Sequence, residues 1–120
     1  MSDANRAREM VRLLGWTRVN YTSGARYARL PSGLEGVDIV AFGSRGHDHV
    51  GVSAYDPTAR ARLEAHAAVW ERLGFERQTG ADSRHATTYC GCFPRPDDGG
   101  LDPRIGRELQ RVRMELAKLK

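Results

Sequence analysis

Four side chains able to bind a metal ion occur as two closely spaced pairs. His47 and His49 form a His-X-His pair, and Cys90 and Cys92 form a Cys-X-Cys pair. Because side chains alternate along an extended strand, each pair places two ligands on one face, and neighbouring strands would complete a Cys2His2 zinc site. The alternative is that the cysteines are two small, reduced, half-buried strand residues and that no cofactor is bound.

Two carboxylates, Glu9 and Asp38, stand in a context that points to phosphodiester chemistry. Glu9 follows Arg8 on a predicted helix, and Asp38 lies in the segment Gly36-Val37-Asp38-Ile39-Val40-Ala41. Together with Gly15-Trp16 and the Ser23-Gly24 turn between them, this layout resembles the PD-(D/E)XK nuclease family, notably the Holliday-junction resolvases, over about residues 4–73. The resemblance implies that Glu9 and Asp38 would help to bind Mg²⁺.

The Glu-X-Lys motif that completes the site of that family is missing here. The matching segment, residues 50–55, reads VGVSAY, and both lysines, Lys118 and Lys120, lie at the C-terminal end. The resemblance therefore implies a domain that kept the fold and lost hydrolysis, although a metal-dependent nuclease stays an alternative. Asp38 can also be read as a carboxylate at a strand edge or turn.

A second resemblance begins at His49. The segment 49–53, the helix that ends in WERLGFE (residues 70–76) and the hairpin with Thr88-Tyr89 are similar to half of a vicinal-oxygen-chelate protein. The glyoxalases and bleomycin-resistance proteins belong to that family, and the likeness covers about residues 49–93. It implies a metal-binding role for His49, whereas the acid and the opening strand expected elsewhere in the family are missing.

Positive charge is concentrated at the two ends of the chain. Residues 1–34 carry a net charge of +4, residues 35–101 carry −3, and residues 102–120 carry +3. Most of the cations are arginines, which suit bidentate contacts to phosphate, although a GC-rich genome would also enrich arginine. Nucleic acid is therefore the predicted partner. The predicted contact residues are Arg6, Arg8, Arg12, Arg18, Arg26 and Arg29.

The pattern of apolar residues predicts an α+β fold: a helix, a three- to four-stranded mainly antiparallel sheet, a second helix, two further strands and a C-terminal amphipathic helix. We expect a core domain at 1–93, a Pro/Gly linker at 94–101 and the C-terminal helix at 102–120. The predicted elements are helix 4–14, strands 16–22, 25–30, 37–42 and 50–55, a helix from Asp56-Pro57 to Gly74, and strands 75–79 and 85–93.

The C-terminal helix carries an apolar seam with heptad spacing. Its members are Ile105, Leu109, Val112, Leu116 and Leu119. Little more than two heptads long, this seam needs a partner surface. It either docks on its own domain or pairs with another chain as a short coiled coil, and the spacing favours neither.

Several function classes are excluded by what the sequence lacks. No apolar run reaches the length of a membrane span, the N-terminal residues lack the apolar core of a signal peptide, and neither a phosphate loop nor a Gly-X-Ser-X-Gly elbow occurs. We therefore expect a small cytoplasmic, non-catalytic binding protein associated with nucleic acid or with a nucleic-acid machine. The alternatives are an assembly module that acts through the C-terminal helix, and a metal-dependent nuclease or chelate-type ligand binder.

Overall fold

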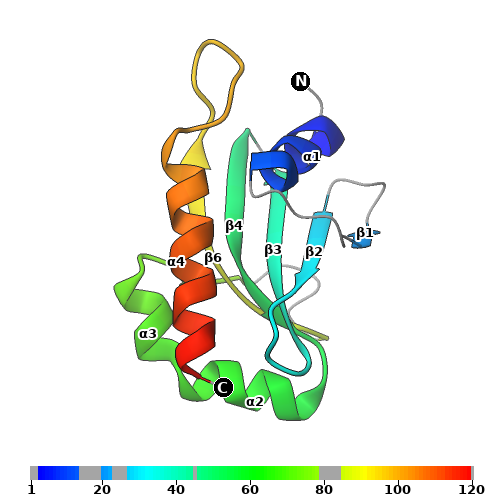
Figure 1. Cartoon of the computed structure of the whole chain (residues 1–120), viewed down its shortest axis with the longest axis vertical. Helices are drawn as coiled ribbons and strands as arrows, with labels where there is room; N and C mark the ends of the chain where they lie inside the picture. Colours follow the sequence, from blue (N-terminus) through cyan, green and yellow to red (C-terminus); the bar gives the residue numbers. More distant parts are fainter. Residues whose placement is uncertain (1–2, 14–19, 23–26, 45, 79–84, 120) are drawn as a thin grey trace.

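An antiparallel sheet forms the centre of the molecule (Figure 1). The computed structural model describes residues 3–13, 20–22, 27–44, 46–78 and 85–119. Six strands pair in the order β1-β2-β3-β4-β6-β5. Their bounds are β1 (Asn20–Thr22), β2 (Tyr27–Pro31), β3 (Val37–Ser44), β4 (His47–Ala54), β5 (Glu76–Arg77) and β6 (Thr87–Pro94). The predicted α+β class and its order of elements are confirmed.

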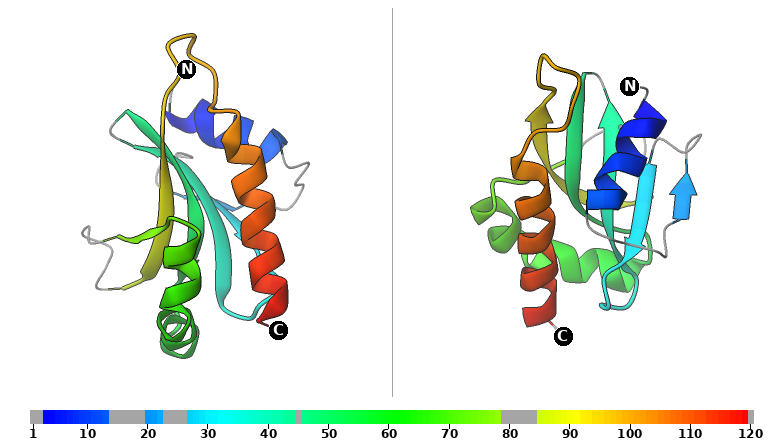
Figure 2. Two further views of the ribbon diagram at one scale, coloured as in Figure 1. Left: turned by 90° about the vertical axis from the view of Figure 1, so that its left-hand side faces the viewer. Right: turned by 45° about the horizontal axis from the view of Figure 1, so that its top comes forward.

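Within the described residues, four helices accompany the sheet. They are α1 (Asp3–Leu13), α2 (Pro57–Ala65), α3 (Ala67–Arg72) and α4 (Arg104–Lys118). The left view of Figure 2 shows α1 and α4 on one side of the sheet, and Figure 1 shows α2 and α3 near its lower end. Asp56 begins α2 as the pattern predicts, because its carboxylate accepts a hydrogen bond from the amide of Ala59 ahead of an N-terminal proline.

The second predicted helix is interrupted at His66, which separates α2 from α3. In a continuous helix the carbonyl of Leu63 would accept a hydrogen bond from the amide four residues later. Here it accepts hydrogen bonds from the indole Nε1 of Trp70, at 3.0 Å, and from the amide of His66. The break lets both Leu63 and Trp70 become fully buried. A continuous apolar stripe in the sequence therefore corresponds to two short helices that share one core.

The two faces of the sheet have different chemistry. Alternate residues of β3 and β4, among them Ile39, Ala41, Val50 and Val52, face α1 and α4 and form the hydrophobic core. The opposite face carries aromatic and polar side chains, which include Tyr27, Arg29, Asp38, Phe42, His49, Ser53, Thr88, Cys90 and Cys92. None of the four described helices lies on this second face (Figure 2).

The apolar seam of α4 packs into the core of its own chain. Ile105, Leu109, Val112 and Leu116 are all fully buried, and Leu119 packs partly buried against them. The expected linker also contacts the body of the protein, since the carbonyls of Gly99 and Gly100 accept hydrogen bonds from Arg6. The structure therefore shows the seam docked on its own domain. Pairing with another chain would require these residues to leave the core.

Candidate nucleic-acid interface

Arg6 is a predicted phosphate contact that the structure places in the interior. Its side chain is 2% exposed, and its Nε donates to Asp48 Oδ1 at 2.7 Å while a terminal nitrogen donates to Asp48 Oδ2. Asp48 is fully buried, and Arg95 lies 3.7 Å from the same carboxylate. The prediction is wrong for Arg6, because a buried carboxylate required a cation and the first helix supplied it.

Arg29 is likewise withdrawn from the surface. It lies on β2 at 6% exposure and donates to Asp38 Oδ2 at 3.1 Å, to the hydroxyl of Tyr55 at 2.6 Å and to Ser53 Oγ at 3.3 Å. Its guanidinium also stacks over the Tyr55 ring at 4.1 Å. Arg29 therefore orders a polar cluster on the second face of the sheet instead of meeting a phosphate. The predicted contacts Arg18 and Arg26 lie outside the described residues.

The remaining predicted contacts, Arg8 and Arg12, are exposed on α1. Arg12 forms an ion pair with Glu9 at 2.7 Å, and this hydrogen bond lowers the pKa of the Glu9 carboxyl below its usual range. Both groups of the pair stay accessible to solvent, so the interaction contributes little to stability and is readily exchanged for another anion.

The outer side of α4 carries further exposed cations. Its apolar seam faces the core, so the basic residues of the helix are left to solvent. Within α4, Arg111 pairs with Glu108 at 2.8 Å and Lys118 pairs with Glu115 at 3.2 Å. Arg107 is exposed and has no hydrogen-bond or ion-pair partner among the described residues.

The two basic ends of the sequence meet in the structure. Helices α1 and α4 contact each other, and the left view of Figure 2 shows both on the same side of the sheet. Together they present a surface that we call the basic helical face. Its exposed cations are Arg8, Arg12, Arg104, Arg107, Arg111, Arg113 and Lys118. The acids on these two helices are Asp3, Glu9, Glu108 and Glu115, so positive charge still predominates there.

Glu9 and Asp38, the candidate catalytic carboxylates, do not converge. Glu9 lies on α1, which covers the apolar face of the sheet. Asp38 alternates with the core residues Val37 and Ile39 and so belongs to the opposite face, where it pairs with Arg29. The sheet separates the two carboxylates, and the structure does not form the shared magnesium cleft that the nuclease resemblance implies.

The four candidate metal ligands share the second face without forming a cluster. His49 lies opposite Cys92 across β4 and β6, whereas His47 lies opposite Pro94. No group of three or more His, Cys, Asp or Glu side chains is suitably placed for a metal within the described part of the chain. Burial raises the pKa of the Cys90 thiol well above its usual range and also raises that of Cys92.

His49 has a structural role that the sequence did not indicate. Its ring stacks on Phe42 at 4.7 Å, and Phe42 in turn stacks on Tyr27 at 4.5 Å, so one row of rings crosses three strands. The buried Nδ1 of His49 has no hydrogen-bond partner in the part of the chain that the structure describes, and desolvation lowers the pKa of the imidazole. Burial similarly raises the pKa of the Tyr27 phenol. The spacing of alternate residues in β2 and β3 is the signal that would have revealed this row.

The lowered pKa of His49 predicts a pH-dependent loss of stability. The folded state holds this imidazole neutral, whereas the unfolded chain takes up a proton near its ordinary pKa of about 6.5. Stability should therefore fall as the pH drops below about 6.5. Urea unfolding at about pH 5.5 and 7.5 should show a smaller difference for His49→Gln than for the wild type.

The exposed residue His47 provides the control for this pH dependence. His47 belongs to the same strand and face, but its side chain is open to solvent. His47→Gln should keep the wild-type pH dependence. An unchanged pH dependence in His49→Gln would contradict the role assigned to His49.

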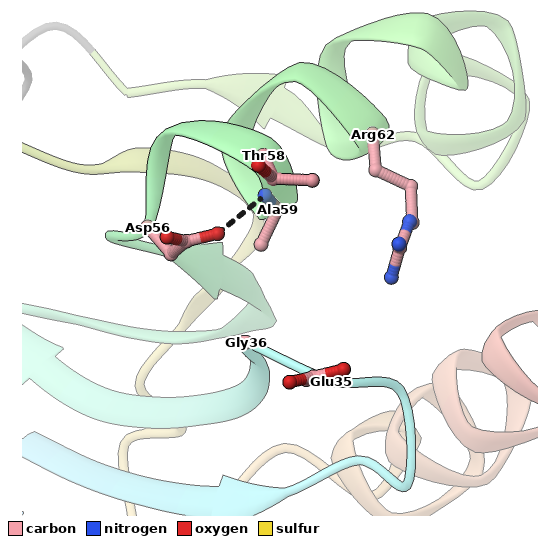
Figure 3. Close-up of a pocket in the computed structure, with 6 residues that line it drawn as sticks. All are labelled: Glu35, Gly36, Asp56, Thr58, Ala59 and Arg62. Atoms are coloured by element: carbon pink, nitrogen blue, oxygen red, sulfur yellow. Dashed lines mark hydrogen bonds between the residues drawn. The ribbon is translucent and has the colours of Figure 1, made fainter.

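A pocket of about 330 Å³ lies at the junction of α2 with the turn between β2 and β3 (Figure 3). Its lining residues are Glu35, Gly36, Asp56, Thr58, Ala59 and Arg62. Among these lining residues, only Asp56 belongs to a motif that was identified in the sequence, as the cap of a helix. The pocket arises from tertiary packing between segments about twenty residues apart.

None of the described helices is long and apolar enough to cross a membrane. Comparisons with protein-family models, with curated proteins and with solved structures found no match to this chain.

Proposed function

We propose that the protein binds nucleic acid, without cleaving it, through the basic helical face. The observation that carries this proposal is that two basic segments from opposite ends of the chain lie on one side of the sheet. Arginine guanidinium groups suit phosphate oxygens because they donate two parallel hydrogen bonds. A surface with this distribution of charge favours contact with the phosphate backbone over readout of base edges.

The geometry of α4 suits an extended polyanion. Arg104, Arg107, Arg111 and Lys118 recur at intervals of three, four and seven residues, so they follow one side of the helix over about 21 Å. Arg8 and Arg12 extend this surface onto α1. The Arg12–Glu9 pair on α1 is exposed at both ends, so it can be exchanged for a phosphate contact at little cost.

Charge reversal on this face should weaken binding to a labelled DNA duplex. Arg8 and Arg107 are the best positions, because both are exposed and neither has a partner among the described residues. Fluorescence anisotropy with the Arg8→Glu/Arg107→Glu variant should show affinity reduced by about ten-fold or more at low salt. The slope of log K against log salt should become shallower by about 0.9 for each phosphate that the variant no longer neutralises.

The matched control changes the net charge equally at another place. Arg62→Glu/Arg72→Glu alters α2 and α3, outside the basic helical face, and should retain most of the affinity. Equal losses in the two double variants would show that net charge alone governs binding. Absence of wild-type binding at low salt to duplex, branched and single-stranded DNA and to RNA would overturn the proposal.

A further inference from the structure

The pocket of Figure 3 has charged groups of opposite sign on its two walls. Arg62 extends from α2 into the opening, and Glu35 stands across from it on the turn between β2 and β3. No ion pair joins them, and neither has a hydrogen-bond partner among the described residues. Two opposite charges that face one space without meeting leave room for a ligand that carries both complementary charges.

Further polar groups lie beside each charge. The hydroxyl of Thr58 lines the pocket without a partner in the described part of the chain. Asp56 contributes a second carboxylate, of which Oδ2 accepts a hydrogen bond from the amide of Ala59 and Oδ1 accepts none from the described residues. The Asp56 side chain thus already caps this end of α2, so an anion here would depend on Arg62 and Thr58 and not on the helix terminus.

The backbone of the turn is built to hold these walls in place. Gly36 adopts a φ of 77°, which L side chains rarely adopt, and a Cβ added there would lie 2.8 Å from the Cβ of Ala59. Only glycine therefore lets the turn approach α2 this closely. The same approach sets Glu35 opposite Arg62 and limits the space between them.

We infer that this pocket binds a small zwitterion of the free α-amino-acid class. The ligand carboxylate would accept hydrogen bonds from Arg62 and Thr58, and its ammonium would donate to Glu35 and Asp56. The volume of about 330 Å³ stands at the lower end of the range for ligand pockets, which favours a small ligand. The lining includes no large apolar side chain, so glycine, alanine and serine fit better than large apolar amino acids. This inference does not rest on the proposed binding of nucleic acid.

The test is a titration of the ¹⁵N-labelled full-length protein with glycine, L-alanine and L-serine, followed by amide chemical shifts. The expected result is saturable shifts in the amides of residues 35–36, 56 and 58–62. Methylamine and acetate, each carrying one of the two charges, should bind about ten-fold or more weakly at equal ionic strength. This comparison uses the wild-type protein and does not depend on the folding of any variant.

Variants then test whether the charged residue on each wall of the pocket contributes to binding. Arg62→Gln and Glu35→Gln should each weaken binding by about ten-fold or more, whereas the exposed controls Arg72→Gln and Glu71→Gln should leave it unchanged. Non-saturating shifts, or equal responses to an amino acid and to acetate, would overturn the inference. Wild-type affinity in both pocket variants would overturn it as well.

Discussion

Replacing Asp48 with alanine is expected to lower the free energy of unfolding by about 3–5 kcal/mol, because breaking a buried ion pair leaves an uncompensated charge in the interior. Asp48 is fully buried and Arg6 is 2% exposed. Without the carboxylate, Arg6 would retain carbonyl acceptors at Gly99 and Gly100 but lose its counter-charge. Arg95, 3.7 Å from Asp48, would lose its counter-charge as well. Urea denaturation followed by circular dichroism measures the change.

An exposed ion pair on the same helix provides the comparison. Arg12 and Glu9 are 71% and 37% exposed, so Glu9→Gln should lower the free energy of unfolding far less than Asp48→Ala does. The combined change Arg6→Met with Asp48→Leu should recover much of the loss, since it removes both buried charges at once. Similar costs for Asp48→Ala and Glu9→Gln would contradict the burial of the Arg6–Asp48 pair.

The second large effect is expected in α4. Leu109→Ala and Leu116→Ala should each lower the free energy of unfolding by about 2–5 kcal/mol, because both side chains are fully buried against the sheet and a cavity would remain. The two sites lie two helical turns apart, so their costs should add approximately. Urea denaturation of both variants and the wild type, carried out at several protein concentrations, measures this loss of stability.

Concentration dependence separates the two ways in which the seam of α4 can be buried. Docking within one chain gives a midpoint that does not change with protein concentration, whereas pairing between chains raises it with concentration. Met114, an apolar residue of the same helix that is 63% exposed, is the matched control. Met114→Ala should alter stability by about 0.5 kcal/mol or less. A midpoint that rises with concentration would contradict docking within the chain.

Local pattern predicted most of the fold. The strands β3, β4 and β6, the N-terminal end of α2 and the helix α4 follow from apolar periodicity and from a recognisable Asp-Pro cap. The break at His66 could not be predicted, because it depends on the indole of Trp70 reaching the carbonyl of Leu63. That contact is a consequence of tertiary packing and leaves no signal in the spacing of apolar residues.

The roles of individual arginines were much less predictable. Arg6 and Arg8 are neighbours of the same type, yet one is buried beside Asp48 and the other is exposed. A helix of 3.6 residues per turn assigns them to different sides, but only the fold shows that a carboxylate lies on one of those sides. The pocket beside Arg62 was missed for a related reason, since it joins a turn to a helix that begins some twenty residues later.

The hydrogen bonds from Arg6 to Gly99 and Gly100 set a requirement on biosynthesis. They join residues more than ninety positions apart, and α4, which follows them directly, completes the core. A ribosome adding about 5–20 residues per second would expose α1 several seconds before its buried arginine meets these carbonyls. The native fold is therefore expected to form only after α4 has left the exit tunnel, and residues 1–119 should remain sensitive to protease until then.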